Sequence, residues 1–152
     1  MHFVTLFLLK NEELDNITLS EIVEDFCNRF CYCCGESTPK YEYWCDWFQI
    51  GGRWCDMLKA TRGYVGERSW GNVEAEHIEN TYSVVEIKDL TEPIEANSIY
   101  AIATKSRIYH NPDDDDGNND GNSVPKNSFH KLLEKINNKK INGVIAIVDC
   151  HD

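Results

Sequence analysis

The chain begins and ends with a short apolar run, and these two runs constrain the fold more than any other feature. Residues 2–9 (HFVTLFLL) are aromatic and aliphatic with little alternation, and residues 143–150 (GVIAIVDC) form a second, nearly continuous apolar run. A membrane helix needs about 20 apolar residues, whereas a strand buried on both faces of a sheet reads as a short continuous run. The sequence therefore predicts two buried strands, with residues 2–9 central in a sheet that is covered on both faces.

A single intracellular domain over residues 1–152 is the expected organisation. The length of 152 residues falls within the usual range of about 100–200 for one domain. The first apolar run has no basic residues before it and no small-residue cleavage site after it, so we expect no export signal. Seven cysteines, an odd number, then favour reduced thiols in the cytoplasm.

Two helices and two further strands are predicted between the terminal runs. Residues 18–21 (TLSE) have the spacing of a capping box, and apolar residues then recur at helical spacing as far as Gly35. Residues 129–136 mark a second amphipathic helix, while 82–87 and 98–110 are typical of strands and are expected to pair. This order predicts an α+β, ferredoxin-like β-α-β-β-α-β sheet with two helices on one face.

The segment 36–75 is an aromatic, Trp-rich insertion after the first helix. It holds all four tryptophans of the chain, and its glycine pair weakens any helix there. Strands that are apolar on both faces need a second cover, and this segment is the remaining one with enough apolar surface. We therefore expect it to pack against the sheet face that the helices leave open.

The charge of the chain limits the class of partner. With 26 acidic and 15 basic residues, the formal net charge is -11. Nucleic acids and anionic membranes bind cations, so neither is an expected partner, and a protein with a basic surface is. Residues 111–122 (NPDDDDGNNDGN) predict an acidic, flexible loop. Its candidate partner-binding residues are Asp113, Asp114, Asp115 and Asp116.

Residues 46–54 (DWFQIGGRW) combine a carboxylate, a glycine pair and a guanidinium between indoles. The glycines permit a positive φ or close backbone approach, and the guanidinium can stack on the indoles and bond the carboxylate. Two interpretations stay open: a structural knot that pins the insertion to the sheet, or an anchor for an anion or carbonyl group in an aromatic pocket. The candidate binding residues are Asp46, Trp47, Gly51, Gly52, Arg53 and Trp54.

This run resembles the D-W-[YF]-x-[IV]-G-G-R-W signature of small uncharacterised proteins from bacteriophages and bacteria. Residues 148–151 (VDCH) resemble the V-D-C-H ending of the same proteins. The resemblance rests on these two motifs alone and implies a phage or mobile-element context, and so a host-cell cytoplasm. It also implies that these proteins have a site in common, and that Asp149 and His151 belong to it. It implies no mechanism, because the family has no agreed activity.

The cysteines offer two chemistries. Cys150 beside His151 invites a thiol nucleophile, but neighbouring residues of a strand point to opposite faces, so the base would have to be His77 or His110. Cys27, Cys31, Cys33 and Cys34 form a cluster in which the first two, four residues apart on the predicted helix, could share zinc. The paired C-x2-C spacing of structural zinc sites is missing, so buried thiols are the preferred interpretation.

Residues 116–121 (DGNNDG) match the opening of a calcium-binding EF-hand loop. Asn127 stands where the bidentate Glu is needed. This loop is therefore expected to be disordered or to bind a cation only weakly. For the chain as a whole we expect no bound metal, no cofactor and no catalytic residue.

Three functions remain in view. The leading hypothesis is an acidic protein-binding module of phage type that engages a host protein with a basic surface, and inhibits a defence protein such as a CRISPR nuclease. The first alternative is a small enzyme or ligand-binding protein with a pocket beside Asp46, Arg53, Trp54, Asp149 and His151. The second is a zinc-stabilised interaction module.

Overall fold

The computed structural model describes residues 1–11, 21, 47–105, 107–113 and 127–151. The helix predicted from residue 19 to residue 34 falls almost wholly outside these residues. Asp46 and the acidic residues Asp114–Asp116 lie outside them as well.

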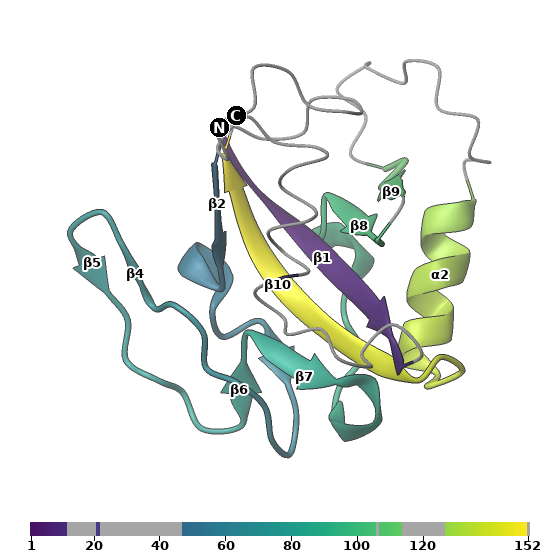
Figure 1. The fold of residues 1–152 in the computed structure, drawn as a ribbon, viewed down its shortest axis with the longest axis horizontal. Helices are drawn as coiled ribbons and strands as arrows, with labels where there is room; N and C mark the ends of the chain where they lie inside the picture. The colour runs from purple at the N-terminus through teal and green to yellow at the C-terminus, as the bar shows by residue number, and fades with distance from the viewer. Residues whose placement is uncertain (12–20, 22–46, 106, 114–126, 152) are drawn as a thin grey trace.

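The two terminal runs form the paired strands at the centre of the structure. β1 (His2–Lys10) and β10 (Gly143–His151) run antiparallel over all 9 residues, from His2 opposite His151 to Lys10 opposite Gly143. Both strands are buried apart from His2, Lys10, Val144 and His151, as the lack of alternation predicts. The pairing brings the two ends of the chain to one corner of the sheet (Figure 1).

Within the described residues, the main sheet has six strands in mixed orientation. β8 (Ala101–Ala103) pairs parallel to β1, and β9 (Ile108–His110) continues the sheet as the antiparallel neighbour of β8. On the other side, β10 is shared between β2 (Trp47–Ile50), which pairs with its last residues, and β7 (Val84–Glu86), which pairs with its first. The order is therefore β2-β10-β1-β8-β9, with β7 beside β10.

Ile147 is the residue at which β10 passes from one edge partner to the other. Its carbonyl accepts a hydrogen bond from the N–H of Gly51 at 2.8 Å, and its own N–H donates to the carbonyl of Ser83 at 2.8 Å. Both the N–H and the carbonyl of Ile147 are therefore hydrogen-bonded at the junction. Two separate segments can thus extend the same sheet without leaving a backbone group unpaired there.

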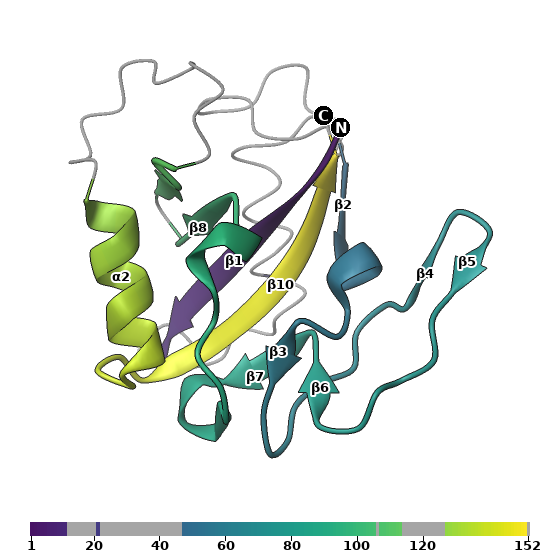
Figure 2. The same cartoon turned by 180° about the vertical axis from the view of Figure 1, so that it is seen from behind.

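Both faces of the sheet are buried, and alternate residues of each strand divide between them. One face packs against the helix α2 (Ser128–Asn137) through Phe129, Leu133 and Ile136, and Figures 1 and 2 show this helix alongside β8 from both sides. On this face the sheet contributes Val4, Leu6, Leu8, Val85, Ile102, Ile145 and Ile147. On the opposite face it contributes Phe3, Phe7, Leu9, Val84, Ala101, Ala103, Ile108, Ala146, Val148 and Cys150.

The segment between β2 and β8 is built from short elements. They are the 3-10 turns η2 (Gly52–Trp54), η3 (Ile87–Asp89) and η4 (Ala96–Ser98), the strand pair β3 (Leu58–Lys59) with β6 (Thr81–Tyr82), and the hairpin of β4 (Ser69–Trp70) with β5 (Val73–Glu74). The β4–β5 hairpin extends away from the main sheet (Figures 1 and 2).

The predicted ferredoxin-like fold is wrong. The described residues contain one complete α-helix, α2, and a mixed sheet of six strands rather than four. The run 98–110 does not form one strand, because the Thr104 hydroxyl and N–H both bond the Arg107 carbonyl and turn the chain between β8 and β9. It therefore pairs with itself, and β7, expected beside it, pairs with β10 instead.

The described part of the Trp-rich insertion divides between the two faces of the sheet. Phe48 and Ile50 lie in an edge strand, where they pack on the face opposite α2. After the glycine turn at residues 51–52 the chain changes side, and Trp54, Met57 and Leu58 pack on the face that α2 covers. Residues 47–58 therefore wrap around the edge of the sheet and pack on both of its faces. The expected cover by residues 36–46 lies outside the described residues.

None of the helices in the described ranges combines the length and the apolar character that crossing a membrane requires.

Shortening the side chain of Ile147, at the junction of β10 with β2 and β7, should destabilise the fold. Ile147 is 0% exposed and packs in the core beneath α2. Ile147→Ala should lower the free energy of unfolding by about 2–5 kcal/mol, because it removes buried methylenes and leaves a cavity. Urea denaturation followed by circular dichroism measures this. Ile78→Ala is the matched control, since Ile78 is 59% exposed and its loss should change stability by about 0.5 kcal/mol or less. Equal losses in the two variants would contradict the assignment of this core.

Candidate functional site

A row of three rings crosses the sheet at the corner where the chain ends meet. The register places His2 of β1 opposite His151 of β10, and His151 opposite Trp47 of β2. The next row on the same face holds Val4, Asp149 and Gln49. Because cross-strand neighbours point to the same side of a sheet, residues from three distant parts of the sequence share one surface, which we call the terminal cluster: His2, Trp47, Asp149 and His151.

Asp149 is the buried polar centre of this cluster. Its side chain is 0% exposed, and both carboxylate oxygens accept hydrogen bonds. His2 Nδ1 lies 2.9 Å from Oδ1, and the backbone N–H of Arg53 donates to Oδ2 at 3.1 Å. A buried carboxylate is costly unless it is hydrogen-bonded, so these two contacts account for its position in the interior.

The glycine pair makes the approach to Asp149 possible. Gly52 has a φ of 54°, and a Cβ added there would lie 2.6 Å from Asp149 Oδ2 and 2.8 Å from Asp149 Cβ. Any other residue at this position would therefore collide with the carboxylate and adopt a disfavoured conformation. Gly51 has a φ of 89°, and a Cβ there would meet the Ser83 hydroxyl at 2.5 Å. After β2 the chain can therefore enter the interior because residues 51 and 52 carry no side chain.

The three rings of the terminal cluster contact one another above Asp149. The ring centroids of His2 and His151 are 4.9 Å apart, with an angle of 70° between the planes. Trp47 lies 5.4 Å from His2 in an edge-to-face arrangement and 5.7 Å from His151 in a nearly parallel one. The His2 side chain is 23% exposed and Trp47 is 37% exposed, so the cluster is open to solvent on one side.

The structure brings several of the predicted site residues together. Trp47, Gly52, Asp149 and His151 meet in the terminal cluster, and Arg53 reaches it through its backbone N–H while its side chain is exposed. Trp54 instead packs in the core on the α2 face. Asp46 lies outside the described residues, so its predicted bond to Arg53 stays a prediction. The choice between a structural knot and a binding anchor also stays open.

His2 is the cluster residue that sequence reasoning missed. It lies 147 positions from Asp149 along the chain, and no local motif links the two. The signal available in the sequence is the pair of apolar runs at the termini: pairing them end to end places residue 2 beside residue 151.

Cys150 has a structural position. It is 0% exposed, lies on the sheet face opposite the terminal cluster, and its thiol is 3.6 Å from the Thr5 hydroxyl. His77, named as a possible base for Cys150, bonds instead with the Thr81 carbonyl at 2.8 Å. A thiol nucleophile at Cys150 therefore gains no support from this geometry.

The predicted metal and acidic-loop residues are only partly described. The cysteine cluster at residues 27–34 and Asp114–Asp116 lie outside the described ranges, so both predictions stay as they are. Among the residues that are described, no group of three or more His, Cys, Asp and Glu side chains could hold a metal ion. Asp113, at the start of the acidic loop, contacts His130 Nε2 at 3.1 Å, and its N–H donates to the Asn111 side chain at 3.0 Å.

A second candidate site is the β4–β5 hairpin with its flanks, residues 67–78, which we call the acidic arm. Arg68 fixes the base of this arm. Its guanidinium binds both carboxylate oxygens of Asp56, at 2.6 and 2.9 Å, and also donates to the carbonyls of Ala75 and Glu76 on the returning strand. The fork of donors on Arg suits such bidentate contacts, so one side chain ties both strands of the arm to the body.

The other end of the base is held by backbone contacts. The N–H of Glu67 donates to the Ile50 carbonyl and its own carbonyl accepts from Gly52, both at 3.0 Å. Beyond this base the arm is solvated: Glu74 and Glu76 are exposed, and so are the apolar Val73 (49%) and Ile78 (59%). The arm is therefore a fixed projection that exposes carboxylates together with two aliphatic side chains.

The Arg68 clamp should make the stability of the chain depend on pH. The hydrogen bonds from Arg68 hold the pKa of Asp56 below its ordinary value of 3.8. A carboxyl group with a lowered pKa in the folded state stabilises the fold above the ordinary pKa and loses this contribution as pH falls through the folded pKa. We expect Asp56→Asn to cost about 1–2 kcal/mol of unfolding free energy near pH 7. This difference from the parent should shrink as pH falls below 3.8 and through the lowered pKa of Asp56.

Urea denaturation of both proteins across this pH range measures the difference. Glu95→Gln, at an exposed position, serves as the control and should differ little from the parent at any pH. A cost of Asp56→Asn that stays constant from neutral to acid pH would contradict the clamp.

Comparison of the chain with models of known protein families, with curated proteins and with solved structures gives no match.

Proposed function

We propose that the chain is an acidic protein-binding module that engages a basic surface of another protein through the acidic arm. This proposal rests on one observation. The arm projects into solvent, yet hydrogen bonds from Arg68 and from the Glu67 backbone hold its base against the rest of the protein. A surface ordered before binding loses less conformational entropy when it binds.

The composition of the arm suits such a role. Charged rims around a few apolar contacts are typical of protein interfaces, and the arm offers Glu74 and Glu76 beside Val73 and Ile78. Acidic groups arranged on a projection steer an encounter with a basic partner and repel an acidic one.

The distribution of charge along the chain supports the same partner. Residues 12–46 contain nine acidic and two basic residues, and residues 113–126 contain five acidic and one basic. The rest of the chain holds 12 of each sign. The entire net charge of -11 therefore lies in two segments, and the remainder is neutral overall.

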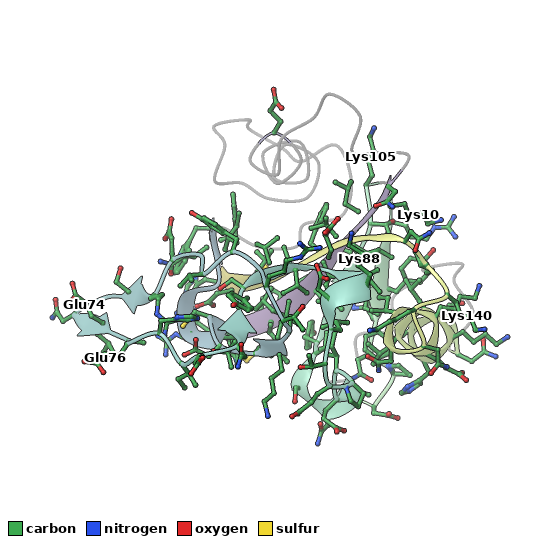
Figure 3. The ribbon with its side chains drawn as sticks, turned by 90° about the horizontal axis from the view of Figure 1, so that it is seen from below. Lys10, Glu74, Glu76, Lys88, Lys105 and Lys140 are labelled. Atoms are coloured by element: carbon green, nitrogen blue, oxygen red, sulfur yellow. The ribbon has the colours of Figure 1, made fainter. Side chains whose placement is uncertain are left out.

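Two acidic side chains of that neutral remainder lie apart from several of its lysines. Figure 3 shows Glu74 and Glu76 at the tip of the arm, while Lys10, Lys105 and Lys140 lie toward the other side of the molecule. A separated charge distribution orients a protein as it approaches a charged surface. The carboxylates at the tip of the arm would therefore favour contact of the arm with a basic surface.

The specific version of this proposal is a phage or mobile-element protein that blocks a host defence protein in the host cytoplasm. A CRISPR nuclease, whose nucleic-acid channel is basic, would be a suitable target for an acidic arm. The enzyme or ligand-binding alternative retains the terminal cluster as its site, and the zinc-stabilised module retains the cysteines at residues 27–34. Neither has an observation in its favour equal to the fixed arm.

Reversing charge on the arm should abolish partner binding. The variant Glu74→Lys with Glu76→Lys changes two exposed side chains and should leave the fold intact. The control, Glu95→Lys with Glu134→Lys, makes the same change of net charge at exposed positions away from the arm. Each protein is immobilised and exposed to host lysate at low and high salt, and the retained proteins are identified by mass spectrometry.

We expect a basic host protein that the parent and the control retain at low salt, that the arm variant loses, and that high salt releases, because salt screens exposed charge pairs. Neutralising Asp113–Asp116 to Asn in a further variant separates the contribution of the acidic loop. Identical retention by the parent and the arm variant, or no retained protein at low salt, would refute the proposed role of the arm.

A further inference from the structure

We propose that the outer edge of β5 is a docking edge for an extended basic segment of the partner protein, which adds to the β4–β5 hairpin as a further antiparallel strand. This inference rests on the proposed function, because it specifies how the acidic arm would hold its basic partner. The segment that fits this edge has basic and apolar residues in alternation.

The two edges of the β4–β5 hairpin have different surroundings. The edge formed by β4 faces the rest of the protein, and there the Ser69 carbonyl accepts a hydrogen bond from the Gln49 side chain at 2.6 Å. The edge formed by β5 is open, since within the described residues β5 pairs with β4 alone. Figures 1 and 2 show β5 on the outer side of the arm, away from the main sheet. An open edge of this kind can accept another strand.

The backbone of Glu74 faces the open edge. The N–H of Ala75 donates to the Arg68 carbonyl at 2.9 Å, so it points toward the β4 side of the hairpin. Backbone groups of successive strand residues point to opposite edges, and the N–H and carbonyl of Glu74 therefore point outward. Ser69, opposite Glu74 in the hairpin, follows the same rule, because its carbonyl points outward to Gln49. An added strand would thus find a donor and an acceptor at Glu74.

The side chains beside this edge select a basic strand. Glu74 and Val73 point to opposite faces of the arm, and Glu76 adds a second exposed carboxylate two residues further along. Opposite charges on directly opposed residues stabilise a strand pair, and like charges destabilise it. A basic residue would therefore lie opposite Glu74, with an apolar residue beside Val73. The same carboxylates disfavour pairing of β5 with β5 of a second copy of the chain.

Strand addition also suits the fixed position of the arm. Peptides that add to a sheet edge gain affinity from main-chain hydrogen bonds and specificity from alternate side chains. Arg68 bonds the carbonyls of Ala75 and Glu76, which holds the segment that carries the open edge. The edge is therefore ordered before a partner arrives, and less conformational entropy is lost on binding.

The test uses the full chain and a short synthetic peptide in which lysine and valine alternate. Fluorescence anisotropy measures the affinity, and amide hydrogen exchange followed by NMR shows where the peptide binds. We expect exchange of the Glu74 N–H to slow on binding, because an exposed donor becomes hydrogen-bonded. The Ala75 N–H, which already bonds the Arg68 carbonyl, should change little and is the internal reference.

Two N-methylated forms of the peptide separate backbone pairing from charge. In an antiparallel pair, the lysine opposite Glu74 would exchange hydrogen bonds with it, whereas the neighbouring valines would direct their N–H groups away. N-methylation of the lysines should therefore weaken binding by at least about tenfold, and N-methylation of the valines should leave it nearly unchanged. A peptide of the same composition, with its lysines and valines in two blocks, should bind more weakly than the alternating one.

The variant Glu74→Lys with Glu76→Lys should weaken binding of the alternating peptide by at least about tenfold. The control Glu95→Lys with Glu134→Lys should not, and circular dichroism checks that both variants fold. Equal affinity for the two N-methylated forms would overturn strand addition, as would an unchanged exchange rate at Glu74 or failure of the alternating peptide to bind. None of these results would refute the broader role of the arm, which the retention of a basic host protein decides separately.

Discussion

The antiparallel pairing of β1 with β10 is the constraint on which the rest of the structure depends. It joins the first and last strands over 9 residues, and both strands are buried on both faces. Every other strand of the main sheet attaches to one of these two, directly or through β8. The same register sets His2 beside His151 and places Asp149 beneath them, so the terminal cluster follows from the pairing of the chain ends.

The second edge of β10 explains how the middle of the chain is organised. Ile147 exchanges backbone hydrogen bonds with Gly51 and Ser83, which belong to different segments. Close packing at this junction needs glycine: added Cβ atoms at Gly51 and Gly66 would meet the Ser83 hydroxyl at 2.5 and 2.6 Å. From this point the chain leaves the sheet, forms the acidic arm and returns as β6 and β7. The position of the arm therefore depends on the same glycine turn that brings Arg53 N–H to Asp149.

The sequence predicts the elements with strong patterns and misses those decided by tertiary contacts. The continuous apolar runs correctly indicate the two central strands, and the periodicity after residue 128 correctly indicates α2. The ferredoxin-like arrangement fails for two reasons. A polar turn at Thr104 divides one apolar run into β8 and β9, and β2 and β7 each pair with a different part of the same edge of β10. Edge pairing of this kind has no local signature. The motif at residues 46–54 gives no sign that Arg53 contacts Asp149 through its backbone N–H, nor that His2 bonds the same carboxylate.

The two candidate sites draw on different chemistry at separate places in the fold. The acidic arm offers a fixed charged surface suited to a protein partner, and the terminal cluster offers two imidazoles above a buried carboxylate. Both require the β1–β10 register. Cross-strand nuclear Overhauser effects measure this register directly. The account predicts backbone contacts between His2 and His151, between Leu6 and Ile147, and between Lys10 and Gly143. A ladder displaced by two residues, or one that connects β1 and β10 to other strands instead, would contradict it.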